Sequence, residues 1–348
     1  MKGHGSVAAT VGPDRTTCSR CLNSEQNPTI DVKEGLCNVC RWFDGRDDKA
    51  ARLAEKSWLA SLGREGHIEC LVGLSGGKDS AATLLQAINL GFSPTAFTID
   101  TGYYPLHIFE RAKAIADQLS VPHITIDARR YARPADLRSF DLTVRFHDDL
   151  AAGQVSRTQC LNLYQLARSH YSAKCNHALA FVRSCQLCRR LVIRAYVDVS
   201  VTTNIPLILL GMNEWTRLSA RGRDVVSGVR DFAPLDGKVV RVVHVPFVQQ
   251  WRLADTMELL GQVSWVPPKG EQVVASNWNS CQFASAANPA VESLLGFHVD
   301  SARLSREVTA GFLSRAEAAA ALDVGHPSTQ TVREVLSAAG LASRLDRT

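Results

Sequence analysis

A glycine-rich turn between a strand and a helix constrains this chain of 348 residues more than any other feature. The apolar run Cys70–Leu74 predicts a buried strand, and the stretch Ser80–Asn89 predicts a helix. The turn between them reads Ser75-Gly76-Gly77-Lys78-Asp79-Ser80. Because glycine has no Cβ, backbone N–H groups and the start of the helix can come close to an anion there. The sequence therefore predicts a phosphate-binding loop, with Lys78 adding positive charge and two serines adding hydroxyl donors.

The loop differs from a Walker A sequence, which has four residues between its glycines and a Ser or Thr after its lysine. Its order instead resembles the PP-loop of the ATP pyrophosphatase superfamily, whose members split ATP into AMP and pyrophosphate while adenylating a substrate. A chance hexapeptide at a strand–helix junction is the alternative. The resemblance implies a catalytic Lys78 and an ATP site made of Ser75, Gly76, Gly77, Lys78, Asp79, Ser80, Asp100 and Gly211.

Strands and helices alternate after the loop. Further strands are predicted over Thr95–Asp100, Ile124–Asp127 and Ile205–Gly211. This alternation predicts the α/β class with a doubly wound parallel sheet, which the resemblance narrows to a PP-loop or HUP-like form. Ligands of such sheets bind at the carboxyl ends of the strands, where Ser75, Asp100 and Gly211 fall.

Four of the ten cysteines have the spacing of a zinc ribbon. Cys18 and Cys21 form one CxxC pair, Cys37 and Cys40 form a second, and fifteen residues separate the pairs. Four thiolates at this spacing can close a tetrahedron around Zn²⁺. A closed site is expected to be structural, because so short a segment cannot form a core of its own. An iron site and a metal-free segment are the alternatives.

A third CxxC pair, Cys185 and Cys188, is followed at once by two arginines and a predicted helix over Leu191–Thr203. Thiols near a helix N-terminus and beside arginines are expected to have lowered pKa values. Such thiols suit metal ligation or nucleophilic catalysis. Cys281 lies 96 positions after Cys185.

This second cysteine set resembles that of the PP-loop tRNA thiolases, which carry a CxxC before basic residues and a lone third cysteine about a hundred positions later. The resemblance implies that Cys185, Cys188 and Cys281 hold a [4Fe–4S] cluster with one iron open to sulfur. The alternatives are a redox or catalytic thiol pair at Cys185 and Cys188 without a cluster, and a structural pair such as half of another zinc site.

Four regions are predicted along the chain. They are a disordered leader (1–17), the zinc ribbon (18–44), the PP-loop ATP pyrophosphatase domain (45–290) and a helical C-terminal region (291–348). The last contains a capping box at Ser314–Glu317 and is expected to serve packing or homodimerisation.

The composition is that of an ordinary globular protein, with 45% hydrophobic and 21% charged residues and a net charge of +5. No segment approaches the roughly 20 apolar residues that cross a bilayer, and the first 17 residues lack the apolar core of a signal peptide. We therefore expect a cytoplasmic protein without a membrane partner. In that compartment, the cysteines point to metals or reactive thiols rather than disulfides.

Together these resemblances imply an ATP-dependent sulfurtransferase that uses Mg²⁺. Asn213 and Glu214, after the strand that ends at Gly211, are candidate Mg²⁺ residues. The sulfur would come from sulfide, a cysteine desulfurase or a sulfur carrier. A small acceptor such as a purine or an amide is favoured over tRNA. Arginines that can hold a substrate phosphate or an RNA backbone are Arg189, Arg190, Arg194, Arg217, Arg221 and Arg223.

Two other functions remain open. The segments Cys18–Cys21, Gly35–Cys40 and Leu304–Glu317 resemble parts of the N-acetyl sugar amidotransferases, which adenylate a substrate and accept ammonia from a glutaminase partner. The chain can also be a zinc-ribbon binding protein whose nucleotide domain acts only as a sensor or scaffold.

Overall fold

The structure, a computed structural model, describes residues 16–171, 184–213, 215, 225–232, 237, 239–263, 265–267, 272–276, 281–323 and 328–342. The predicted leader therefore lies outside the described residues up to position 15. Thr16 and Thr17 already pair with the segment at Ser24 and Glu25. Glu214 and three of the candidate arginines, Arg217, Arg221 and Arg223, also lie outside this part of the chain.

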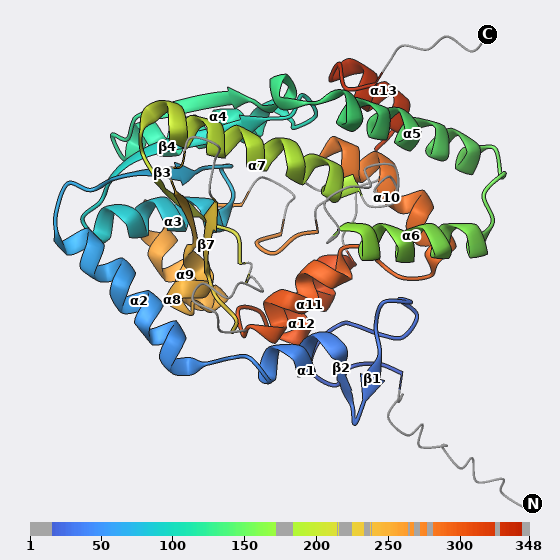
Figure 1. Cartoon of the computed structure of the whole chain (residues 1–348), viewed down its shortest axis with the longest axis horizontal. Coiled ribbons are helices and arrows are strands. Elements are labelled where there is room, and N and C mark those ends of the chain that lie inside the picture. Colours follow the sequence, from blue (N-terminus) through green and yellow to red (C-terminus); the bar gives the residue numbers. More distant parts are fainter. Residues whose placement is uncertain are drawn as a thin grey trace, which may run out of the picture.

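A six-stranded sheet in the order β5-β4-β3-β6-β8-β7 forms the centre of the molecule (Figure 1). Its strands are β3 (Glu69–Gly73), β4 (Ser93–Asp100), β5 (His123–Asp127), β6 (Leu207–Leu210), β7 (Val229–Phe232) and β8 (Val240–His244). All neighbours are parallel except β7, which runs antiparallel to β8 at the edge. The predicted α/β class with a mostly parallel sheet is confirmed, whereas the short edge strand β7 had not been predicted.

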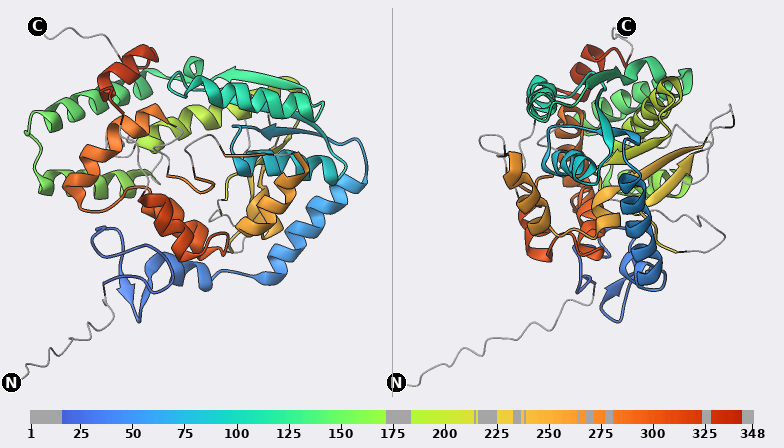
Figure 2. Two further views of the ribbon diagram at one scale, coloured as in Figure 1. Left: turned by 180° about the vertical axis from the view of Figure 1, so that it is seen from behind. Right: turned by 90° about the vertical axis from the view of Figure 1, so that its left-hand side faces the viewer.

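Side chains alternate between two cores on opposite faces of the sheet. Leu71 of β3 belongs to one core, and its neighbours Cys70 and Val72 belong to the other. The first face is covered by α5 (Pro134–Ala151), α7 (Ser184–Thr203), α10 (Gln282–Leu295) and α13 (Val332–Ala338). The second is covered by α2 (Lys49–Arg64), α3 (Lys78–Asn89), α4 (Leu106–Gln118) and α9 (Leu253–Leu260). Figure 2 shows the sheet between these two layers, as expected for parallel strands that are buried on both sides.

The connections change direction between β3 and β6. From β3 the chain moves outward to β4 and β5, and it then returns to β6 on the other side of β3. Such a change of direction, here between β3 and β6, marks the usual place of a ligand in sheets of this kind. The predicted phosphate loop and Gly211 both follow these strands.

Segments from the N-terminal and C-terminal regions of the chain lie side by side below the sheet (Figure 1). The N-terminal ribbon (residues 16–44) contains β1 (Val32–Lys33), β2 (Leu36–Cys37) and α1 (Asn38–Asp44). It lies against the orange-red helices α11 (Ser301–Thr309) and α12 (Arg315–Leu322), as Figures 1 and 2 show. The predicted capping box is confirmed, because Ser314 accepts from the Glu317 N–H and Glu317 accepts from the Ser314 N–H.

The remaining described elements complete the two layers. They are α6 (Arg157–Tyr171), which packs against α10, the short helix α8 (Val245–Gln249), and the 3-10 turns η1 (Ala128–Tyr131) and η3 (Gly261–Val263). None of the helices that the structure describes has both the length and the apolar character needed to cross a bilayer.

Candidate metal centre and candidate nucleotide site

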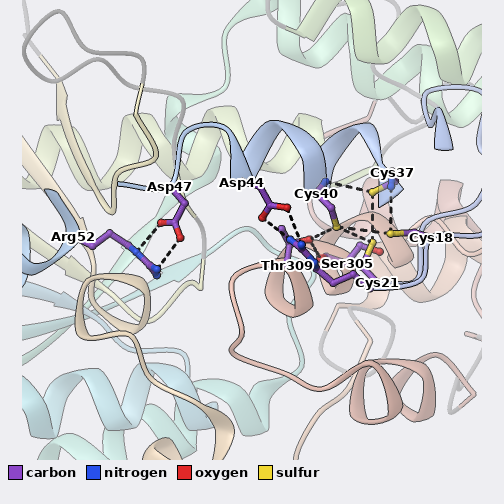
Figure 3. A network of polar contacts seen from close by, with 10 residues as sticks. Cys18, Cys21, Cys37, Cys40, Asp44, Asp47, Arg52, Ser305 and Thr309 are labelled. Atoms are coloured by element: carbon purple, nitrogen blue, oxygen red, sulfur yellow. Dashed lines mark hydrogen bonds and ion pairs between the residues drawn. The ribbon is translucent and has the colours of Figure 1, made fainter. Parts of the chain in front are cut away.

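The four ribbon cysteines point at one another from two turns of the chain (Figure 3). Their Sγ atoms lie 3.8 Å apart between Cys18 and Cys40, and 3.7 Å apart between Cys21 and each of Cys37 and Cys40. All four side chains are fully buried. A tetrahedron with Zn–S bonds of about 2.3 Å has edges of about 3.8 Å, so these separations fit a single tetrahedral ion.

Hydrogen bonds around these sulfurs fix their orientation. The Cys37 N–H donates to Cys18 Sγ at 3.3 Å, and the Asn23 amide donates to Cys37 Sγ at 3.4 Å. The hydrogen bond from Cys21 lowers the pKa of the Cys37 thiol, while the same bond raises the pKa of Cys21 to about 12. Four thiolates this close repel one another unless a cation lies between them. Within the described residues, these four cysteines are the group that can hold a metal ion.

The predicted phosphate loop is organised by its own serines. Ser80 Oγ accepts from the Ser75 N–H at 3.1 Å and donates to the Gly77 carbonyl at 2.9 Å. Gly77 is the N-cap of α3, and no capping side chain accepts a hydrogen bond from the first N–H groups of this helix. The first N–H groups of α3 are therefore directed toward the carboxyl edge of the sheet, where they can bind an anion.

Two glycines bring the backbone of this region close together. Gly76 has φ +72°, and a Cβ there would lie 2.9 Å from Arg111 Cβ. At Gly211 a Cβ would lie 2.5 Å from the carbonyl carbon and oxygen of Asp79 and 2.6 Å from the Ser80 nitrogen. Only glycine permits this approach without movement of the loop. The structure thus brings Gly211, after β6, against the start of α3.

Lys78 and Asp100 already have protein partners. Lys78 Nζ lies 2.6 Å from Asp79 Oδ2, in the loop itself. Asp100 Oδ1 accepts from the Gly102 N–H at 2.7 Å, and its other oxygen lies 3.6 Å from Arg129. Asp100 therefore shapes the turn after β4, next to the loop after β3.

Several buried polar atoms near the carboxyl edge have no hydrogen-bond partner among the described residues. They are Asp79 Oδ1, Thr101 Oγ1, Gln186 Oε1 and Asn213 Nδ2. A buried polar atom left unpaired costs free energy, and such atoms in native proteins usually meet a ligand, an ion or water. Thr101 and Gln186 were not predicted from the sequence as site residues. The sequence did contain a signal for each, because Thr101 directly follows Asp100 and Gln186 lies inside a CxxC pair.

The second cysteine set lies where β4 ends. Cys185 and Cys188 sit in the first turn of α7, and Cys281 is the N-cap of α10. The Tyr104 hydroxyl shares a hydrogen bond with Cys188 Sγ at 3.7 Å, and the Gln282 N–H donates to the Tyr103 carbonyl at 3.3 Å. The turn after β4 therefore lies beside both the CxxC helix and the Cys281 segment.

The predicted lowering of thiol pKa is wrong for Cys188. Burial raises the pKa of this thiol, and the hydrogen bond with Tyr104 opposes the rise only in part. Of the two arginines expected to lower it, Arg190 lies 3.7 Å from Asp136, and the same carboxylate lies 2.5 Å from Arg194. The same ion pairs show that Arg190 and Arg194 have a structural partner.

Burial also raises the pKa of Cys281. Cys185 is exposed, whereas Cys188 and Cys281 are partly buried. These three cysteines are not among the described groups whose ligand atoms lie close enough to share a single ion. A [4Fe–4S] cluster binds each thiolate through a separate iron, so its ligand sulfurs lie farther apart than the sulfurs around a single ion.

Neither a scan against protein-family models nor a search of curated proteins finds a match for this chain.

Proposed function

We propose that this chain is an ATP-dependent sulfurtransferase of the ATP pyrophosphatase type. The observation that carries the proposal is the position of two features at one edge of the sheet. The glycine loop follows β3, and the turn beside Cys188 and Cys281 follows the neighbouring strand β4. An activated intermediate formed at the loop would then lie on the same side of the sheet as the thiols.

The reaction has two steps. A carbonyl oxygen of the acceptor attacks the α-phosphorus of ATP, the bond from that phosphorus to the bridging oxygen breaks, and pyrophosphate leaves. Sulfide then adds to the activated carbon, and the carbon–oxygen bond breaks. AMP takes the oxygen away, sulfide gives its proton to solvent, and C=O becomes C=S without a change of oxidation state. The acceptor is a small metabolite such as a purine or an amide, with tRNA as the second choice.

Residues of the loop would bind the nucleotide. The N–H groups at the start of α3 would donate hydrogen bonds to the phosphates, and Lys78 would offset charge on the departing pyrophosphate. The unpaired oxygen of Asp79 would suit Mg²⁺, which would offset phosphate charge, and the unpaired amide of Asn213 would donate to a phosphate or ribose oxygen.

Two metal groups are assigned to the cysteines. Zn²⁺ held by Cys18, Cys21, Cys37 and Cys40 would be structural, because four protein ligands leave no open position. A [4Fe–4S] cluster held by Cys185, Cys188 and Cys281 would supply sulfide through its fourth iron. The Cys281 segment fits such a ligand, since the Ala284 N–H points at its sulfur at 3.4 Å.

An amidotransferase acting on an N-acetyl sugar nucleotide is the second candidate. The N-terminal and C-terminal segments that resemble those enzymes are in contact, because Arg315 donates to the carbonyl oxygens of Cys18 at 2.8 Å and Ser19 at 3.1 Å. Both candidates need the adenylation step, and they differ in the incoming nucleophile. Ammonia from a partner glutaminase would require no role for Cys188 or Cys281.

The test is an analysis of iron, sulfide and zinc in protein purified without oxygen. We expect about four irons and four sulfides per chain, lost in Cys185→Ala and in Cys281→Ala while zinc remains. Cys160→Ala, which removes a buried cysteine away from the site, is the control and should retain both metals. Zinc alone in the reconstituted protein would overturn the cluster and favour the amidotransferase or a persulfide enzyme.

The nucleotide part has its own test. Adenylation predicts that acceptor-dependent turnover converts ATP to AMP and pyrophosphate, and that Lys78→Ala abolishes it. If Lys78→Ala kept full function in cells, adenylation would be excluded and the sensor or scaffold function would be favoured.

A further inference from the structure

The loop lysine is contacted by a residue from the C-terminal end of the chain. Lys78 Nζ lies 5.4 Å from the centre of the Phe312 ring, within the range of a cation–π interaction. The Phe312 side chain is buried in the same core as the four ribbon cysteines. One ring therefore touches the candidate nucleotide site and the candidate metal centre.

A buried ion pair holds the helix next to Phe312. Glu307 of α11 lies 2.5 Å from Arg303, four residues earlier on the same helix. Burial raises the pKa of the Glu307 carboxyl, and the positive charges of Arg303 and Lys78 oppose that rise.

The ribbon fixes the helix that carries Glu307 and the turn that carries Phe312. Thr309 Oγ1 lies 3.2 Å from Cys40 Sγ, as seen in Figure 3, and Arg315 donates to the Cys18 carbonyl. Leu304 of α11 packs among the ribbon cysteines. The ribbon itself has two strands of two residues and one helix of seven, so its shape depends on the ion that its thiols hold.

We propose that Phe312 is a positioning residue for Lys78, and that the ribbon metal holds it in place, so that metal occupancy and nucleotide binding are coupled. This inference rests on the proposed nucleotide site and adds a regulation to it. Loss of the metal would release α11, remove Phe312 from Lys78 and leave the lysine free to adopt other rotamers. Coupling of this kind is reciprocal, so a bound nucleotide must also retain the metal.

The first experiment measures the affinity for α,β-methylene-ATP with Mg²⁺ by titration calorimetry. In the metal-loaded protein, Phe312→Leu should raise Kd about fivefold, the value of one cation–π contact of about 1 kcal/mol. Phe297→Leu is the matched control, since the Phe297 ring packs edge-to-face with Tyr164, with 5.3 Å between ring centres, in a separate core; it should leave Kd unchanged.

A double-mutant cycle separates positioning from general destabilisation. If Phe312 acts through Lys78, then Phe312→Leu should change Kd by less than about twofold in the Lys78→Ala background. A fivefold loss in both backgrounds would overturn the positioning role.

The second experiment measures metal retention. Wild-type protein should release zinc to a colorimetric chelator several times more slowly when the ATP analogue is bound, and Phe312→Leu should lose this protection while still containing zinc. Equal release with and without bound analogue would overturn the coupling and leave the proposed function intact. If the metal-loaded wild type failed to bind the analogue at all, the inference and the proposed function would both fall.

Discussion

In the ribbon, the four cysteine sulfurs are fully buried and lie 3.7–3.8 Å from their neighbours, whereas at the sheet edge Cys185 is exposed and Cys188 and Cys281 are only partly buried. Four sulfurs at tetrahedral spacing leave no coordination position for a substrate. The sheet edge also keeps polar atoms of Asp79 and Thr101 unpaired. The difference shows that cysteines of one chain can be enclosed at the spacing of a single metal ion in one region and stay partly open to solvent in another; we propose a structural role for the first set and a reactive role for the second.

The largest expected effect comes from replacing one cysteine in each region. Cys37→Ala should abolish zinc binding and lower the free energy of unfolding by about 4 kcal/mol or more, because loss of a structural metal is among the most damaging changes. Cys185→Ala removes an exposed thiol and should change stability by less than about 0.5 kcal/mol. Zinc content and thermal melting measure both.

Equal losses of stability in Cys37→Ala and Cys185→Ala would contradict this difference between the two regions. If Cys37→Ala kept its melting temperature, the ribbon would fold without metal. A large stability loss in Cys185→Ala would instead give the second cysteine set a structural role.

The second effect concerns the backbone contact between β6 and the loop. Gly211→Ala would place a methyl group 2.5 Å from the Asp79 carbonyl, so the loop must shift. We expect a stability loss of about 1–3 kcal/mol and loss of affinity for the ATP analogue. Gly261→Ala is the matched control, because a Cβ there meets no atom within 4 Å and the backbone is helical. Equal stability and affinity in the two variants would contradict a close approach at Gly211.

Much of the fold followed from local sequence. The strand ending before Ser75, the helix from Lys78 and the parallel sheet were predicted because apolar runs and glycine turns act over a few residues. The ribbon was predicted for the same reason, since two CxxC pairs at a fixed spacing specify their own geometry.

Features that depend on distant segments were not predicted. The contact of Phe312 with Lys78 and the docking of α11 on the ribbon join segments more than two hundred residues apart, and no local pattern specifies them. The direction of the Cys188 pKa shift was wrong for the same reason. Burial raises the pKa of this thiol, and burial is set by tertiary packing, not by the residues beside the thiol.

The third effect is a difference in thiol reactivity. In zinc-loaded protein without a cluster, iodoacetamide should label Cys185 fastest, Cys188 more slowly, and the ribbon cysteines not at all. Because burial raises the pKa of Cys188, its thiolate fraction should still rise with pH in the range where a free peptide thiol with pKa about 8.5 levels off. Mass spectrometry of labelled peptides measures the rates. A plateau for Cys188 below pH 8, or early labelling of Cys37, would contradict this assignment of closed and open thiols.

The smallest expected effect tests whether the unpaired polar atoms at the sheet edge form hydrogen bonds with a bound ligand. Thr101 is 1% exposed and its hydroxyl has no partner among the described residues, whereas Thr143 is equally buried and donates to the Ser139 carbonyl at 2.8 Å. Thr143→Val should therefore cost about 1 kcal/mol, the usual net value of a buried hydrogen bond, while Thr101→Val should be neutral or stabilising by up to about 1 kcal/mol. If the unpaired Thr101 hydroxyl contacts the bound ATP analogue, Thr101→Val should lose part of the stabilisation that the analogue gives to wild-type protein, whereas Thr143→Val should keep it. Denaturant unfolding with and without analogue measures both. If Thr101→Val cost as much as Thr143→Val in the free protein, the Thr101 hydroxyl would already be paired, and the sheet edge would be as closed as the ribbon.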